Sequence, residues 1–161
     1  GGPFDAVVSQ FGVMFFDDST AAFANLRRHV KPDGRLVFAC WQSADRNTWN
    51  IGPLLARFAP PPAPPTPGRN PTGPFALADV ARTTEMLQAA GWAGVERTGY
   101  EMTVLVHPET LGDEGQLAFA GIPEPDRPAA WEAVRAKLAE FPTVGDRLEV
   151  PIAFQVFAAH G

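Results

Sequence analysis

Small polar residues and aromatic residues follow two apolar segments that have the composition of buried strands. The first segment, residues 4–11, contains Ala6-Val7-Val8 and ends in Ser9, Gln10 and Phe11. The second, residues 35–41, ends in Trp41. Ligands of open α/β sheets bind outside the carboxyl ends of the strands, so these residues are candidate ligand contacts. The alternative is that Ser9 and Gln10 only satisfy backbone groups while Phe11 packs in the core.

Aromatic side chains are concentrated after the same two segments. Phe15 and Phe16 follow the first, and Trp41 and Trp49 lie at and beyond the end of the second. Together they could line an apolar pocket, with Phe15, Trp41 and Trp49 as the residues that contact a bound molecule. Plain core packing is the competing interpretation, and it is favoured for Phe16.

Groups suited to acid–base or metal chemistry are sparse. The three histidines lie at a helix end, before a proline and at the C-terminus, and no acidic residues recur at metal-ligand spacing, so we expect no metal site. The single cysteine, Cys40, lies inside an apolar strand pattern. We expect it to be a small buried hydrophobic residue rather than a reactive thiol.

The elements that must position these residues begin with a strand, a helix and a second strand. The apolar run in residues 4–11 is typical of a strand buried on both faces. Asp17 to Thr20 supply a helix N-cap, and Pro32-Asp33-Gly34 would stop that helix before the strand at 35–41. This length suits a right-handed crossover between parallel strands.

The next segment, residues 42–75, is polar and then rich in proline, with one or two helical turns expected in residues 51–58. A proline run cannot donate the hydrogen bonds of a helix or a sheet. We interpret it as a stiff surface linker, with a lid over the site as the alternative and a ligand for another domain as a third. A helix beginning at Asp79 and ending at Gly91 should follow.

The last part of the chain has two long strands separated by a helical insertion. Residues 95–106 alternate in polarity as expected at a sheet edge, whereas residues 148–159 are apolar enough for an interior strand. The insertion, residues 108–145, contains a short helix near 114–120 and an amphipathic helix over 126–141. The buried stripe of that second helix should consist of Trp131, Val134, Leu138 and Phe141.

Composition narrows the class of protein. The chain has 161 residues, suited to a single domain, and a net charge of −5 with its basic residues scattered. We therefore expect no nucleic-acid partner. No apolar run approaches the ~20 residues that span a bilayer, and no export signal is visible, so we expect no membrane association and a cytoplasmic location.

Several of these segments resemble a known family. Phe4-Asp5-Ala6-Val7-Val8-Ser9, the aromatic cluster in 11–16, and Lys31-Pro32-Asp33-Gly34 are similar to the class I S-adenosylmethionine-dependent methyltransferases. The nearest type is the small-molecule branch of ubiquinone and menaquinone biosynthesis. Asp33 replaces the first glycine usual in that turn. Leu87 to Trp92 resembles the family's helix before its sixth strand.

The resemblance implies an α/β, partial Rossmann-like sheet made of the family's strands four to seven. Their order would be 4-5-7-6, with the last strand antiparallel and helices on the faces. The family's glycine-rich cofactor turn does not occur in the sequence, so we expect residues 1–161 to be the C-terminal part of a methyltransferase domain.

The resemblance also implies a cofactor, S-adenosylmethionine, and a small apolar or aromatic methyl acceptor. Ser9, Gln10 and Phe11 would contact the cofactor, and Phe15, Trp41 and Trp49 the acceptor. An electron-rich ring can also favour the sulfonium charge. Methyl transfer is an in-line displacement that depends strongly on positioning, so a dedicated general base is not always required, and the sequence offers no obvious candidate for one.

Two other functions compete with methyl transfer. The chain could be a non-catalytic remnant that pairs with another chain or with itself through the exposed edge of the strand at 4–11. It could also be the late part of a nicotinamide-dependent Rossmann oxidoreductase. The inserted last strand and the absence of a Tyr-x-x-x-Lys pair argue against the oxidoreductase.

Overall fold

The computed structural model describes residues 2–61, 72–112 and 114–161. These residues form two compact units. The first contains residues 2–46, 72–100 and 153–161, and the second contains residues 47–61, 101–112 and 114–152. Two long strands, β3 (Ala93–Val106) and β5 (Arg147–His160), contribute to both units.

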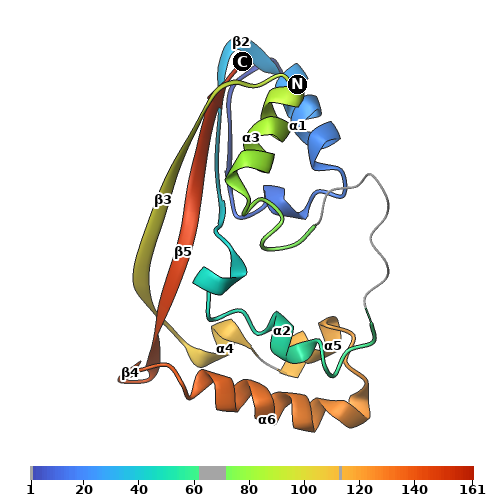
Figure 1. Cartoon of the computed structure of the whole chain (residues 1–161), viewed down its shortest axis with the longest axis vertical. Helices are drawn as coiled ribbons and strands as arrows, with labels where there is room; N and C mark the ends of the chain where they lie inside the picture. The colour runs from blue at the N-terminus through green and yellow to red at the C-terminus, as the bar shows by residue number, and fades with distance from the viewer. Residues whose placement is uncertain (1, 62–71, 113) are drawn as a thin grey trace. The chain divides into compact units, whose positions relative to one another are not determined.

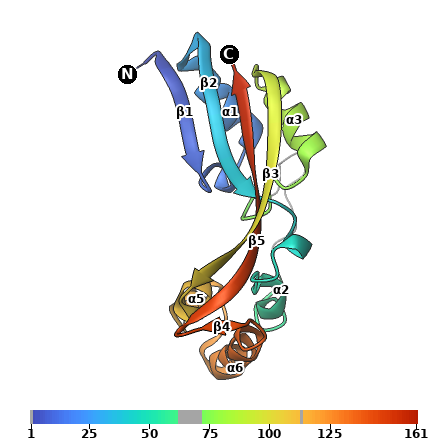
Figure 2. The same ribbon diagram turned by 90° about the vertical axis from the view of Figure 1, so that its left-hand side faces the viewer.

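The sheet has the predicted strand order (Figures 1 and 2). β1 (Phe4–Gln10) pairs in parallel with β2 (Val30–Trp41), β2 pairs antiparallel with β5, and β3 lies at the far edge. The order β1-β2-β5-β3 is the predicted order 4-5-7-6 of the family's strands. The strand at the C-terminus is therefore interior and the strand at 95–106 is an edge, as their polarity patterns indicated.

In the first unit, helices α1 (Ser19–Arg28) and α3 (Val80–Ala89) lie side by side on one face of the sheet (Figures 1 and 2). That face of the strands is apolar. Phe23, Phe38 and Phe157 are fully buried there, and their rings contact one another in series at centroid distances of 5.3 Å. The core of the first unit is thus a layer between two helices and one sheet face.

Both helices begin, and α3 also ends, where local sequence signals predict. The Asp18 carboxylate accepts a hydrogen bond from Ala21 N at 2.9 Å, and Asp79 caps α3 in the same way at 3.1 Å. Gly91 has a φ of +89°, and Trp92 N donates to Leu87 O at 3.0 Å. This arrangement is a Schellman motif, in which glycine is favoured because an L side chain would be strained at that φ.

Two predictions about the first strands are wrong. β1 is not buried on both faces, since Val8 is 76% exposed and Phe4 51%. The physical reason for this exposure is that β1 is an edge strand and that helices cover only one face of its sheet. In addition, α1 ends at Arg28 and residues 32–34 already belong to β2, where a β-carbon on Gly34 would lie 2.9 Å from Asp5 O.

A buried amide ties the segment before α3 to the sheet. Gln155 on β5 is fully buried, and its Nε2 donates to Leu77 O at 2.9 Å and to Ala78 O at 3.2 Å. Its Oε1 accepts from Arg97 Nε at 2.9 Å. Both the nitrogen and the oxygen of the Gln155 amide therefore have hydrogen-bond partners, as buried polar groups in protein cores normally do.

The second unit is mainly helical. It contains α2 (Gly52–Leu55), α4 (Pro108–Leu111), α5 (Glu114–Phe119), the 3₁₀ turn η3 (Glu124–Asp126), α6 (Arg127–Leu138) and the short strand β4 (Thr143–Val144). The stripe predicted for a helix over 126–141 is confirmed for Val134 and Leu138, which are buried on α6, whereas Trp131 is half-buried; Phe141 is also buried but follows the end of the helix.

Short helices and turns occupy the two segments that were predicted to be a proline-rich loop and a helical insertion. Residues 42–75 contain the 3₁₀ turn η2 (Ala44–Arg46) and α2, but residues 62–71 lie outside the described residues, so most of the proline run does too. Residues 108–145 contain α4, α5, η3, α6 and β4. No helix among the described residues is long and apolar enough to cross a membrane.

Candidate functional site

The carboxyl ends of β1 and β2 lie side by side in the first unit. Gln10 is in register with Ala39, and one residue further on Phe11 N donates to Ala39 O at 3.1 Å. Ser9 is half-exposed and Gln10 is exposed. The three residues predicted to contact a cofactor are therefore brought together at one sheet end, beside the start of the 3₁₀ turn η1 (Val13–Phe15).

Phe11 has an uncommon backbone conformation. Its φ is +55°, the left-handed region, and it is the only described non-glycine residue there. A bulky residue in this region costs about 1–3 kcal/mol, and such residues gather at ligand sites and active sites. The conformation turns the chain sharply at the end of β1, directly after the polar pair Ser9-Gln10.

Four aromatic side chains form a row across the sheet end, which we call the aromatic cluster: Phe11, Trp41, Tyr100 and Phe154. Phe11 stacks on Trp41 with ring centroids 4.2 Å apart and an interplanar angle of 21°. Phe154 contacts Phe11 edge to face at 6.0 Å and stacks on Tyr100 at 5.1 Å. Tyr100 remains 43% exposed, so one end of this apolar row is accessible to solvent.

Gln42 holds the backbone under the aromatic cluster. Its side chain is buried, and Nε2 donates to Phe154 O at 2.8 Å and to Tyr100 O at 3.2 Å. Its Oε1 accepts from Arg46 Nη1 at 3.0 Å. This role of Gln42 could not be predicted from the sequence, because its partners come from two strands far along the chain.

The predicted acceptor residues are not all brought together. Trp41 belongs to the aromatic cluster, whereas Phe15 lies on η1, 57% exposed, and its ring contacts none of that cluster among the described residues. Trp49 belongs to the second unit, where its Nε1 donates to Asn47 Oδ1 at 2.9 Å. Phe16 packs edge to face on Phe23 at 5.9 Å, as expected for a core residue.

The histidines lie at the surface. His29 Nδ1 is 2.9 Å from Asn25 O, His107 Nδ1 is 3.7 Å from Asp146 Oδ2, and His160 Nδ1 is 3.1 Å from Gly161 O. Among the residues that the structure describes, no three side chains of His, Cys, Asp or Glu converge as metal ligands would. The site is thus built from aromatic rings and amides.

Cys40 should resist alkylation in the folded chain. Burial raises the pKa of its thiol to about 12, against an ordinary 9.0, although Gln155 and Arg97 act in the opposite direction. Since the thiolate is the reactive form, we expect iodoacetamide at pH 8 to modify native Cys40 at least roughly 1,000-fold more slowly than the urea-unfolded chain. Mass spectrometry of quenched time points gives both rates.

The raised pKa of the Cys40 thiol also makes the free energy of unfolding depend on pH in a definite direction. Above about pH 9 the unfolded thiol ionises and the folded one does not, so the free energy of unfolding falls as pH rises towards 12. A Cys40→Ala variant should lose this part of the pH dependence. Native alkylation within tenfold of the unfolded rate would show that the thiol is accessible and contradict the burial argument.

A parallel strand pair followed by an antiparallel strand inserted before the edge strand is the arrangement predicted for the late part of a Rossmann-like sheet. Residues 1–38, which include β1 and α1, match the family model described as a methyltransferase domain. The predicted resemblance to methyltransferases is therefore confirmed. Its assignment to the ubiquinone and menaquinone branch stays a prediction.

Two solved bacterial structures share the fold. A protein of Bacillus halodurans C-125, provisionally assigned as a methyltransferase, superposes with a TM-score of 0.54 at 10% identity, over 98% of this chain. The YcgJ protein of Bacillus subtilis also has a TM-score of 0.54, at 12% identity and 98% coverage. This chain spans 64% and 63% of their lengths, respectively. No curated protein matches it in sequence.

Proposed function

We propose that this chain forms the C-terminal part of an enzyme that transfers a methyl group from S-adenosylmethionine to a small apolar or aromatic acceptor, in the cytoplasm. One observation carries the proposal. In the segment that matches the methyltransferase domain, β1 ends in Ser9-Gln10, and Phe11, the next residue, is held in a left-handed conformation against Trp41. Ligands of such sheets bind at this end.

In this proposal the residues have separate roles. Ser9 and Gln10 offer hydroxyl and amide groups to the polar methionine portion of the cofactor, and the Phe11 ring supports the sulfonium. Trp41 and the exposed ring of Tyr100 give a flat apolar surface to the acceptor, while Phe15 and Trp49 remain predicted contacts. The protein would act mainly by aligning acceptor, methyl carbon and leaving sulfur, with the acceptor's proton passing to solvent.

The test is to locate cofactor binding on the chain. We expect S-adenosylhomocysteine, added at about 5 mM because binding should be weak, to shift backbone amide NMR signals of residues 9–12 and 41–42. Adenosine serves as the control that lacks the amino-acid portion and should shift residues 9 and 10 less. Shifts confined to other residues, or none at all, would remove the proposed role of this sheet end.

A second candidate function is pairing through β1, and the exposure of that strand favours it. An edge strand leaves backbone groups unpaired, and here Val8 is 76% exposed beside them. We propose self-association of the chain through the β1 edge as the form this pairing takes in isolation.

We expect sedimentation velocity to show a concentration-dependent dimer. Val8→Lys should weaken dimerisation at least about tenfold, because a buried lysine charge at the strand pair would be desolvated. Val144→Lys is the matched control, since Val144 is 50% exposed on β4 in the other unit. A monomer at every concentration, or equal effects of the two variants, would contradict pairing through β1.

A further inference from the structure

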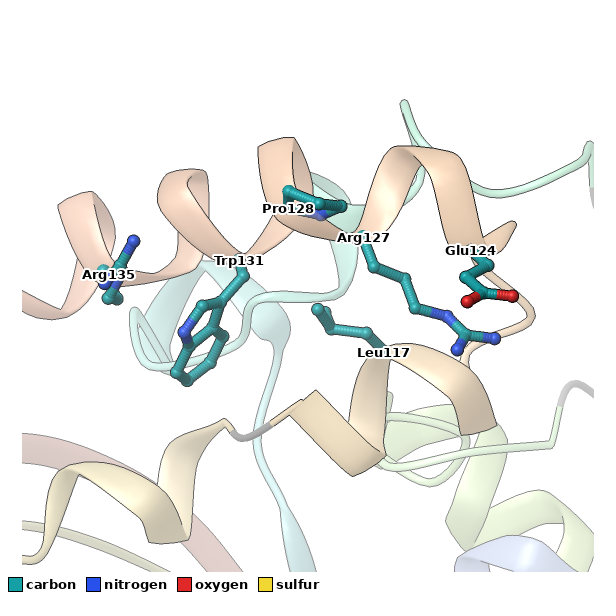
Figure 3. A pocket seen from close by; sticks show the side chains of 6 residues that line it. All are labelled: Leu117, Glu124, Arg127, Pro128, Trp131 and Arg135. Carbon is teal, nitrogen blue, oxygen red and sulfur yellow. The ribbon is translucent and has the colours of Figure 1, made fainter.

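A concave surface lies entirely within the second, mainly helical unit, and the proposed methyl transfer does not involve it. It is an open cavity of about 340 Å³ between α5, η3 and α6 (Figure 3). We call it the α6 groove, and its lining residues are Leu117, Glu124, Arg127, Pro128, Trp131 and Arg135. Its volume is within the range of small-molecule sites, about 300–1,000 Å³.

The spacing of three residues on α6 builds one wall of the α6 groove. Arg127, Trp131 and Arg135 are four residues apart, so they lie in a row along one side of the helix. Figure 3 shows this row, with Leu117 of α5 facing it. Leu117 is fully buried and Trp131 half-buried, which gives the middle of the groove a flat apolar floor.

The two arginines are not equivalent. Arg127 Nε donates to Ile122 O at 3.1 Å, and the Glu124 carboxylate lies beside its guanidinium in Figure 3. Arg135, at the other end of the row, makes no side-chain hydrogen bond or ion pair with any residue that the structure describes. The exposed Arg135 guanidinium is thus available to a ligand.

We propose that the α6 groove binds a small aromatic carboxylate. Arg135 pairs with the carboxylate, for which a guanidinium is the best-matched side chain because it can donate two parallel hydrogen bonds. The ring stacks on Trp131 and contacts Leu117 and Pro128. The other end of the groove carries one positive side chain, Arg127, and one negative side chain, Glu124, and takes a neutral polar substituent. This site belongs to the second unit and the proposed cofactor residues belong to the first, so the proposal does not depend on them.

The test uses a matched pair of probes on the full chain. 1-Naphthoate carries the proposed carboxylate, and 1-naphthamide has the same rings without the charge. We expect naphthoate to bind at least about tenfold more tightly by calorimetry. It should also shift the Trp131 indole N–H signal, which Trp131→Phe identifies, ahead of the signals of Trp41 and Trp49.

Variants separate this binding from adventitious contact. Arg135→Gln should reduce naphthoate affinity to the naphthamide level, whereas Arg147→Gln, on the exposed start of β5 in the same unit, should leave it within twofold. Unchanged signals of Trp41, Trp49 and Trp92 report that each variant is folded.

Three results would overturn the proposal. Equal affinity for naphthoate and naphthamide would remove the carboxylate from it. A naphthoate shift at Trp41 without one at Trp131 would place binding at the aromatic cluster. Inorganic phosphate that binds as tightly as naphthoate would show that the groove selects charge alone and has no preference for an aromatic body.

Discussion

Titration of this chain with S-adenosylmethionine should give a dissociation constant in the millimolar range or weaker, about 1,000-fold above a micromolar site. The chain offers the residues after β1, but its sequence has no glycine-rich turn of the kind that the resembling enzymes place after their first strand. Backbone donors to a charged ligand group contribute about 1.5–3 kcal/mol each. Two missing contacts therefore reduce affinity by roughly 10²- to 10⁴-fold.

Calorimetry at high chain concentration measures this affinity. Gln10→Ala should reduce the residual binding further, because the exposed amide at the end of β1 is one of the few polar groups the chain retains for the ligand. Val144→Ala, on β4 in the other unit, is the control and should have no effect. Micromolar binding by the unaltered chain would contradict this prediction, because it would mean that the site does not need the glycine turn.

Local signals in the sequence predicted the elements well where one residue decides a backbone choice. Asp18 and Asp79 mark helix starts because their carboxylates satisfy amide groups within the first turn, and Gly91 marks an end because it tolerates a positive φ. The edge and interior positions of β3 and β5 also followed from polarity, since an edge strand has one wetter face.

Features that depend on distant partners could not be predicted. The apolar run of β1 has the composition of a buried strand, yet exposure depends on which elements cover it, and α1 and α3 cover only one face. The roles of Gln42 and Gln155 depend on carbonyl groups at least 58 positions away in the chain, which no local pattern reveals. Of the row on α6 only Trp131 was predicted, as part of a buried stripe, because periodicity alone does not distinguish core from groove.

The candidate site likewise contains some residues that could be predicted from the sequence and others that could not. Ser9, Gln10, Phe11 and Trp41 were predicted because consecutive parallel strands end at the same side of a sheet, so sequence neighbours of two strand ends become spatial neighbours. Tyr100 and Phe154 were missed as site residues, since only the insertion of β5 between β2 and β3 brings them to that end. A topology inferred from resemblance could have placed them there.

Replacing Phe38 should produce the largest loss of stability among single substitutions in the first unit. Phe38 is fully buried on β2, stacked on Phe157 and tilted against Phe23 at centroid distances of 5.3 Å. Phe38→Ala removes these contacts and leaves a cavity, which costs about 3–5 kcal/mol. That is a large fraction of the 5–15 kcal/mol typical of a whole domain, so Phe38→Leu provides a milder variant if the alanine variant does not fold.

Phe15→Ala is the matched control, because it deletes the same side chain at a position that is 57% exposed. Little apolar surface is returned to water there, and we expect a change below about 1 kcal/mol. Urea unfolding followed by circular dichroism gives both differences, with equal m-values showing that the unfolded states are comparable. Similar losses for the two variants would mean that the face of the sheet carrying Phe38 is not the core of this unit, and that Phe15 is covered in solution.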